Sequence, residues 1–461
     1  LIPQPVDIEW HSDTIPAGEV SFQLPALEGD LSRRTYLLAE LEEIFGPSNK
    51  NGLPMEFRLA EVSVPRGEDE AYQLRANTDG VLVTANTPVG FLRALTTLRQ
   101  LTKERDGKRT ISACDITDYP AFPIRGYMVD TGRNFQTIEQ LKVQIDSVAA
   151  YKLKVFHWHL NDDPGWRLES KLYPDLQADR ASSRDDGKFY TQKEFVAMVD
   201  YCWTRGITVI PEFDSPGHSE AFRKGLGLDN MRQPEAIKAM TALISELCGL
   251  VPAERMPYFH VGTDEVRRAS DKVGRDYLEK LHAAVKAEGR EVIGWHHGMH
   301  LPGDKSQIIQ TWAQSAPIKG MRHIDSRSNY INHLNPLDAP LRMQFQQPCR
   351  VPHADETNLG GILCYWPDLP ITDKSTMLNI SPVLVSLVAY SEAMWLGVKK
   401  DQPEFWAKVP PLGSPEFTRH ANLEDRLIEH RDRFFRGKPF HFVKSNHISW
   451  KLLGPGYDKE V

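Results

Sequence analysis

Two acidic residues, Asp264 and Glu265, stand next to each other directly after a short apolar run at 258–263. Buried carboxylates are costly unless each has a partner, so such a pair at a strand end favours a functional role over a cap or an ion pair. Cleavage of a glycosidic bond uses one carboxyl group that protonates the leaving oxygen and a second group that stabilises the positively charged sugar. Because side chains of a strand alternate between faces, both residues reach one ligand only where the strand ends and the backbone turns.

Aromatic residues stand at the ends of four other apolar runs. They are Trp295, Trp312, Tyr330 and Trp366. Each alone is more typical of a core, but their shared placement predicts a pocket with flat apolar walls and polar tips, which suits the apolar face of a sugar ring. Arg125 opens a further run, and its charged, forked guanidinium could bind vicinal hydroxyls or form a surface ion pair.

Two histidines separated by one residue, His157 and His159, allow a different chemistry. This spacing places both imidazoles on one face of a strand, and His218, Asp162 and Asp214 could complete the site of a metal-dependent amidohydrolase. A sugar-binding barrel without catalytic activity is the other alternative. It is disfavoured because an acid, its acidic neighbour and a tyrosine are all present.

Eight apolar runs alternate with longer amphipathic ones from about residue 119 onward, as in a parallel sheet wrapped by helices. The runs are 124–130, 154–160, 208–213, 258–263, 291–295, 307–312, 325–331 and 361–366. This α/β pattern predicts a (β/α)8 TIM barrel, in which catalytic groups come from the C-terminal ends of the strands. The residues named above stand at those ends.

The first part of the chain has a different pattern. Residues 1–118 mix short alternating segments with helix candidates at 31–44 and 88–102, which predicts a small α+β domain. Two prolines close together at 120 and 123 mark the boundary. We expect the catalytic barrel to span 119–440, and 441–461 to be a C-terminal tail or the start of a truncated domain.

Composition excludes several classes of protein. The 461 residues carry 55 Lys and Arg against 62 Asp and Glu, a net charge of −7, so the chain offers no basic surface for nucleic acid. No apolar stretch is long enough to span a membrane. Five scattered cysteines argue against a disulfide framework and a structural zinc site. The chain begins without a signal sequence, so it is either cytosolic or has lost a signal before this numbering starts.

Several motifs occur in an order that resembles the family 20 glycoside hydrolases, the β-N-acetylhexosaminidases. They are GFLRALTTLRQL at 90–101, RGYMVD at 125–130, FHWHLNDD at 156–163, VIPEFDSPGH at 209–218, HVGTDE at 260–265, and Trp366. The resemblance covers roughly residues 1–435. It implies removal of terminal β-linked N-acetylglucosamine from glycans, with no metal or other cofactor. It also implies an extracytoplasmic location and an exo-acting pocket, and leaves the oligomeric state open.

The resemblance assigns a role to each candidate site residue. Glu265 would be the general acid/base, Asp264 would orient the 2-acetamido group and stabilise its positive charge, and Tyr330 would hydrogen-bond the acetamido oxygen. That oxygen attacks the anomeric carbon in this family, giving an oxazolinium intermediate with retention of configuration. Asp162 and His218 resemble a supporting relay to Glu265. The sugar would be held by Arg125 and enclosed by Trp295, Trp312 and Trp366.

Three residues depart from the family pattern. Asn332 and Asp368 stand where the family usually has Asp and Glu, at positions that contact the outer hydroxyls O4 and O6. Replacing a carboxylate by an amide removes repulsion toward an anion, so we hypothesise altered selectivity there, extending to N-acetylgalactosamine or a 6-O-sulfated sugar. Thr263 stands where the family commonly has glycine.

Overall fold

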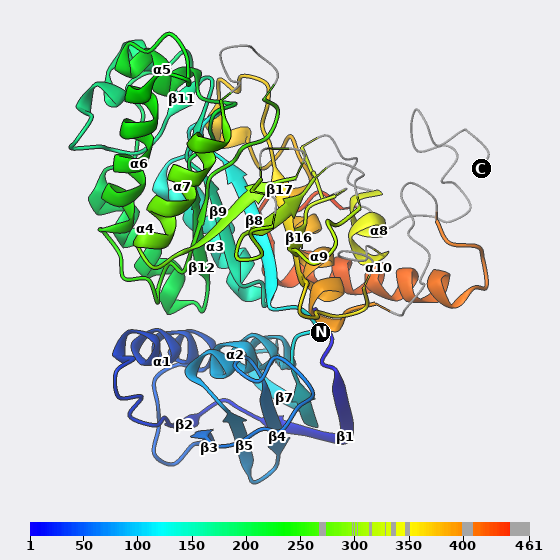
Figure 1. Ribbon diagram of the computed structural model, residues 1–461. Helices are drawn as coiled ribbons and strands as arrows, with labels where there is room; N and C mark the ends of the chain where they lie inside the picture. The colour runs from blue at the N-terminus through cyan, green and yellow to red at the C-terminus, as the bar shows by residue number, and fades with distance from the viewer. Residues whose placement is uncertain are drawn as a thin grey trace.

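The computed structural model of the chain describes residues 1–266, 273–296, 298, 300, 301, 303–312, 316–327, 329–332, 338–345, 351–398 and 409–442. All but the first two residues of the expected tail at 441–461 lie outside this part. A sheet domain built from the first residues lies against a barrel built from the rest (Figure 1). Among the described helices, none combines the length and hydropathy needed to cross a membrane.

The N-terminal domain is a seven-stranded sheet covered by two helices. Its strand order is β1-β7-β4-β5-β3-β2, with β6 pairing β7. The strands are β1 (Asp7–Pro16), β2 (Val20–Gln23), β3 (Leu53–Leu59), β4 (Tyr72–Asn77), β5 (Gly80–Ala85), β6 (Thr102–Arg105) and β7 (Lys108–Asp118). Helices α1 (Leu31–Phe45) and α2 (Pro88–Leu101) lie between this sheet and the barrel (Figure 1).

Helix α2 is fixed by its first residues and by burial on several sides. Pro88 suits the first helical position, and the Thr87 side chain caps the helix by accepting from the backbone N–H groups of Val89 and Gly90. Almost all of its side chains are buried, because the sheet packs on one face and the barrel on the other. The helix therefore joins the two domains.

The remaining chain forms a closed barrel of eight parallel strands surrounded by helices, which confirms the predicted fold class. The strands are β8 (Ile124–Asp130), β9 (Val155–His159), β12 (Thr208–Glu212), β13 (Tyr258–His260), β14 (Glu291–Trp295), β15 (Ile308–Thr311), β16 (Arg322–Asp325) and β17 (Asn358–Tyr365). β17 pairs β8 and closes the ring. Apolar side chains such as Met128, Ile210 and Ile324 fill its centre, so the barrel is a packed core.

Helices pack outside the barrel strands (Figure 1). They are α3 (Ile138–Ala150), α4 (Gln192–Thr204), α5 (Glu220–Leu226), α6 (Pro234–Cys248), α7 (Arg275–Ala287), α8 (Asp338–Phe345), α9 (Val383–Leu396) and α10 (Pro415–Phe434). Capping boxes start α3 and α4, where Thr137 and Thr191 exchange bonds with Gln140 and Glu194. A short hairpin of β10 (Asn161–Asp162) and β11 (Gly165–Trp166) follows β9.

The seventh barrel strand lies earlier than its predicted range of 325–331. β16 ends at Asp325, because the polar residues after it bond locally instead of continuing the ladder. The Asp325 carboxylate accepts from the Arg327 backbone N–H at 2.8 Å, and the Asn329 amide donates to the Asp325 carbonyl at 3.0 Å. Tyr330 rejoins the sheet only through a single bridge to Cys364. It therefore lies beyond the strand end, where a pocket can use it.

A buried carboxylate, that of Glu70, links the N-terminal domain to the start of the barrel. It is fully buried and lies 2.7 Å from Arg93 of α2, 2.6 Å from Arg125 at the start of β8, and 3.1 Å from Lys154. Burial alone would raise the pKa of Glu70, but these three cations hold it well below its ordinary value. The domains thus share one compensated charge cluster.

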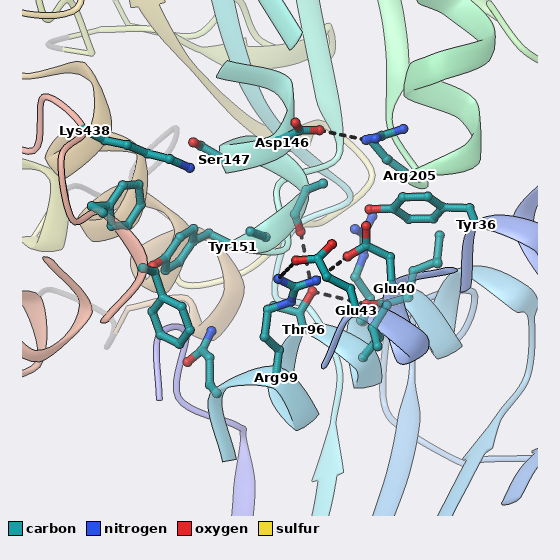
Figure 2. A pocket seen from close by; sticks show the side chains of 18 residues that line it. Tyr36, Glu40, Glu43, Thr96, Arg99, Asp146, Ser147, Tyr151, Arg205 and Lys438 are labelled. Atoms are coloured by element: carbon teal, nitrogen blue, oxygen red, sulfur yellow. Dashed lines mark hydrogen bonds and ion pairs between the residues drawn. The ribbon is translucent and has the colours of Figure 1, made fainter. Parts of the chain in front are cut away.

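The same interface holds a cavity of about 410 Å³ between the two domains. Figure 2 shows that α1 and α2 contribute the Glu40 and Arg99 side chains, while Asp146 and Arg205 come from the barrel side. Arg99 lies 2.5 Å from Glu40, and Arg205 lies 2.9 Å from Asp146. The charges within each of these two pairs therefore neutralise each other where they line the cavity.

Replacing Glu70 by Gln should destabilise the fold strongly, since it leaves three buried or half-buried cations without their anion. Breaking a buried pair costs about 3–5 kcal/mol in the free energy of unfolding. The pKa of Glu70 is depressed in the folded state, so its contribution is complete above the unfolded pKa and is lost as the pH falls toward the folded value. Urea unfolding at neutral and acidic pH measures both effects.

The matched control is Glu56→Gln on β3, whose side chain pairs with Arg58 while both remain largely exposed. An exposed pair contributes less than about 1 kcal/mol. Equal losses of stability for the two variants would contradict the role assigned to Glu70.

Candidate active site

A cavity of about 180 Å³ opens at the C-terminal end of the barrel. It is lined by Arg133, Asp162, Asp214, His218, Asp264, Glu265, Trp312, Tyr330, Asn332, Trp366 and Asp368. These residues follow seven of the eight barrel strands, so the fold gathers side chains that are far apart in the sequence. Except for Arg125 and Trp295, every residue to which the family resemblance assigns a role lines this cavity.

The turn after β13 directs Asp264 and Glu265 into the cavity together. Gly262, Thr263 and Glu265 have positive φ values of 69°, 83° and 46°, so the backbone leaves the strand conformation there. Positive φ is strained for a β-branched residue such as Thr263. The turn therefore overrides the alternation that would send neighbouring side chains of a strand to opposite faces.

His218 connects Glu265 to a second carboxylate. Its Nε2 lies 3.5 Å from Glu265 Oε2, and its Nδ1 lies 3.4 Å from Asp162 Oδ2. Burial would lower the pKa of His218, but Asp162 and Glu265 raise it well above its ordinary value. Glu265, with a third of its side chain exposed, therefore faces an imidazolium on one side and solvent on the other.

Asp264 is the more enclosed member of the acidic pair. Burial raises its pKa, and its Oδ1 has no hydrogen-bond partner among the described residues. Asp214 lies behind it, and burial together with the charge of Asp264 raises the pKa of Asp214 well above its ordinary value. A buried carboxylate oxygen without a donor is costly, so Asp264 is ready to accept a hydrogen bond from a ligand N–H group.

Aromatic rings form one wall of the cavity. Trp312 and Tyr330 are nearly parallel, with ring centroids 6.4 Å apart and an interplanar angle of 9°. Trp366 is tilted against Tyr330 at 5.9 Å. These faces suit the apolar side of a sugar ring.

Trp295 does not line the cavity, which corrects one sequence prediction. It is the last residue of β14, and its side chain is buried at 1% exposure beneath Trp366, 5.9 Å away between ring centroids. Its Nε1–H donates to Glu212 Oε1 at 2.7 Å. Trp295 therefore supports the aromatic wall from below.

Arg125 is also misplaced by the sequence prediction. As the second residue of β8 it lies at the opposite, N-terminal end of the barrel, fully buried against Glu70 and the carbonyl oxygen of Lys152. The guanidinium in the cavity belongs to Arg133, which follows the C-terminal end of β8. Its Nη1 donates to Asp130 at 2.8 Å. The rule that sites form at C-terminal strand ends could have selected Arg133 instead of Arg125.

Arg133 also reaches the outer end of the cavity. Its Nη2 lies 3.1 Å from Asp162, its Nε lies 3.9 Å from Asp368, and its guanidinium lies 5.1 Å from the Trp366 ring centroid. The Asn332 side-chain amide donates to Asp368 Oδ2 at 3.1 Å, while its Oδ1 has no hydrogen-bond partner among the described residues. This end therefore combines a cation, an anion and an amide.

The two histidines of the 157–159 motif contact a carboxylate below the cavity. His157 Nε2 lies 2.9 Å and His159 Nδ1 lies 2.6 Å from Oε2 of the fully buried Glu212. Carboxylate and imidazole atoms here are close enough to hold a metal ion. They already bond to one another, however, and they lie beside the buried Trp295 ring. Among the described residues that line the cavity, His218 is the sole histidine. The arrangement thus differs from an open site of several imidazoles around a metal-bound water.

Sequence comparison places these observations in a family. The catalytic-domain model of glycosyl hydrolase family 20 matches residues 122–229, and the model of domain 2 of that family matches residues 1–119. A β-hexosaminidase of Vibrio furnissii is 28% identical over 375 residues, 68% of this chain and 59% of the relative. A β-N-acetylhexosaminidase of Cellulomonas fimi is 31% identical over 283 residues, 56% of each chain.

A solved structure has a similar fold. The crystal structure of an inactive variant of a GH20 exo-β-N-acetylglucosaminidase from Vibrio harveyi superposes with a TM-score of 0.73 at 26% identity, covering 86% of this chain and 73% of that one. The chain spans less than two thirds of the length of the two curated relatives above. The domain order and the barrel agree with this family, and the comparisons together support the similarity of the chain to glycosyl hydrolase family 20.

Proposed function

We propose that this protein is a retaining exo-β-N-acetylhexosaminidase that removes terminal β-linked N-acetylglucosamine from glycans. The observation that carries the proposal is the pairing of Glu265, beside the His218 imidazolium, with Asp264, whose buried Oδ1 has no described partner. One carboxyl group can then move the proton while the other orients a neutral acetamido group. The small cavity, about 180 Å³, suits one terminal sugar and an exo-acting enzyme.

The proposed reaction has two steps. In the first, the acetamido carbonyl oxygen attacks the anomeric carbon, the glycosidic bond breaks, and Glu265 donates its proton to the leaving oxygen. Asp264 accepts a hydrogen bond from the acetamido N–H and stabilises the positive charge of the oxazolinium ion. Tyr330 donates to the acetamido oxygen and aligns it for attack. This is substrate-assisted catalysis, which needs no carboxylate nucleophile.

In the second step the oxazolinium ring of the intermediate opens. Glu265, now a carboxylate, takes a proton from water as the water oxygen attacks the anomeric carbon. The bond from the acetamido oxygen to that carbon breaks, which regenerates the neutral acetamide and gives a product of retained configuration. The His218 imidazolium stabilises Glu265 while it is ionised, and Asp162 holds His218 in that state.

Selectivity at the outer hydroxyls is the finer part of the proposal. Asn332 and Asp368 line the cavity at the positions that the resemblance places at the outer hydroxyls, and only Asp368 is a carboxylate. An amide repels an anion less than a carboxylate does and adds an N–H donor, so we propose that 6-O-sulfated glucosaminides are accepted through the first change and N-acetylgalactosaminides through a new bond to O4.

Replacing Glu265 by Gln should remove the proton donor and keep the shape of the site. For phenyl N-acetyl-β-glucosaminide, whose leaving group needs protonation, kcat/KM should fall about 10²–10⁴-fold, the usual contribution of a general acid. For the 2,4-dinitrophenyl substrate, whose leaving group departs unaided, the loss should be smaller.

The matched variant is Asp264→Asn, which affects the attack by the acetamide and should lower kcat/KM for both leaving groups by a similar factor. If the wild-type protein hydrolyses neither substrate, the proposed activity is wrong. If Glu265→Gln loses the same factor on both substrates, Glu265 is not the acid.

Replacing Asn332 by Asp should restore repulsion toward an anionic substituent. Relative to the plain glucosaminide, kcat/KM for the 6-sulfated substrate should fall about tenfold, because two like charges near 4 Å repel by about 1 kcal/mol or more. The galacto isomer, measured beside it, shows whether the change acts on O4 as well. An unchanged ratio of sulfated to plain substrate would refute the role of Asn332.

A further inference from the structure

His159 ends β9 directly below the cavity, and the reaction described above gives it no role. Its side chain is fully buried, and each ring nitrogen faces a carboxylate. Nδ1 lies 2.6 Å from Glu212 Oε2, and Nε2 lies 3.1 Å from Asp162 Oδ2. A neutral imidazole has a single N–H, so two anionic neighbours at these distances require the protonated ring.

Both neighbours of His159 are held as anions. Burial alone would raise the pKa of Glu212, but His159, His260 and His157 hold it well below its ordinary value. Burial would also raise the pKa of Asp162, and Arg133 and the imidazoles lower it instead. The pKa of His159, which burial alone would lower, is in turn raised well above its ordinary value by these carboxylates.

His157, two residues earlier on the same face of β9, provides the contrast. Its Nε2 lies 2.9 Å from the same oxygen of Glu212, but its Nδ1 has no partner among the described residues. Burial lowers the pKa of His157 to about 4. The two histidines of this motif therefore share one carboxylate while only His159 carries a charge.

Through His159, the series of contacts that starts at Glu265 continues into the interior of the barrel. The order is Glu212, His159, Asp162, His218 and Glu265, with successive separations of 2.6, 3.1, 3.4 and 3.5 Å. Acceptors and donors alternate along this path. Its inner end is fully buried, and its outer end is the proposed general acid.

Other charged groups face the same path. Arg133 Nη2 lies 3.1 Å from Asp162 Oδ2 and 3.3 Å from His218 Nδ1, so His159, Arg133 and His218 all compete for one oxygen of Asp162. Carboxylate oxygens of Asp130 and Asp214 lie within 4.8 Å of His159 ring nitrogens, in separate groupings. The cluster is thus rich in carboxylates, and the charge of His159 offsets part of that excess.

We propose that His159 is a positioning residue of the active site, which holds the Asp162 carboxylate in the orientation that keeps His218 against Glu265. It touches no substrate and transfers no proton, and it acts through Asp162. The inference rests on the proposed function, because it assigns the path a role in the proton donation by Glu265. The supporting relay that the family resemblance implies consists of Asp162 and His218, and the contacts of His159 continue it to Glu212.

Removing the charge of His159 should affect Glu265 in two ways. Asp162 loses a donor, so His218 is less well fixed and proton donation to a poor leaving group becomes slower. In addition, the loss of one positive charge among Glu212, Asp162, Asp130 and Asp214 makes the site more negative. Protons on His218 and Glu265 are then held more tightly, so the alkaline limb of the kcat/KM profile moves to higher pH.

The test compares His159→Asn, His159→Gln and His157→Gln. Asn places an amide N–H near Nδ1 and keeps the contact to Glu212, whereas Gln places it near Nε2 and keeps the contact to Asp162. His157→Gln is the matched control, because it replaces a neutral imidazole whose donor at Nε2 the amide reproduces. Each variant is assayed from pH 4 to 9 on phenyl and 2,4-dinitrophenyl N-acetyl-β-glucosaminide, with thermal melting as a measure of folding.

We expect kcat/KM for the phenyl substrate to fall roughly tenfold to a hundredfold in His159→Asn, less than the loss of the acid itself. His159→Gln should lose less, since it still donates to Asp162, and His157→Gln should lose least and keep the alkaline limb of the wild type. Both His159 variants should lose less on the 2,4-dinitrophenyl substrate and should show the shifted alkaline limb.

Equal losses on the two substrates, or an alkaline limb that stays in place, would overturn the proposal and leave His159 with a purely structural role. Glu212→Gln is the second variant, expected to reproduce the shifted profile because it removes the inner partner of His159. If all His159 variants and Glu212→Gln fail to fold while His157→Gln folds, His159 and Glu212 serve only the fold and the proposal is wrong. Absence of any wild-type activity would instead refute the proposed function.

Discussion

Glu212 places a negative charge in the interior of the barrel, and the structure around the active site is built to compensate it. An isolated buried carboxylate is strongly unfavourable, so donors must surround it. The side chains around it come from three neighbouring strands: His157 and His159 of β9 and Trp295 of β14 donate to it, and His260 Nδ1 of β13 lies 3.0 Å from its Oε1. Four consecutive strands, including β12 itself, are thereby fixed below the cavity. The position of Trp295 below the aromatic wall, and the series of contacts from Glu212 to Glu265, both depend on this arrangement.

The two ends of the barrel use the same principle for different purposes. At the N-terminal end, Glu70 gathers Arg93 and Arg125 in a closed cluster with no access for a ligand, and the result is attachment of the first domain. At the C-terminal end the cluster stays open on one side, because Glu265 remains partly exposed next to His218. A compensated buried charge stabilises the fold, and one left with an open face can exchange a proton.

The sequence allowed the acidic pair, His218, Asp162 and Tyr330 to be placed because they follow apolar runs, and parallel strands bring such ends together. It failed where placement depends on which end of a strand a residue occupies. Arg125 begins β8 and therefore lies at the far end, while Trp295 is still within β14 and points into the interior. Asn329 and Tyr330 fall within the predicted seventh strand but lie beyond the observed one, because local side-chain bonds end β16 at Asp325, which periodicity alone does not reveal.

The turn after β13 shows how the fold accepts local strain to aim the acidic pair. Glycine tolerates the φ of 83° found at Thr263, whereas a β-branched side chain is strained there by about 1–3 kcal/mol. The backbone N–H of Thr263 donates to Asp214 Oδ1 at 3.1 Å, and the N–H of Gly262 donates to His260 Nδ1 at 3.0 Å. Both acceptors belong to the cluster of charged and polar side chains around the active site. The same side chains therefore also stabilise the turn. Threonine can therefore occupy position 263, where the family commonly has glycine, because hydrogen bonds to active-site residues offset its backbone strain.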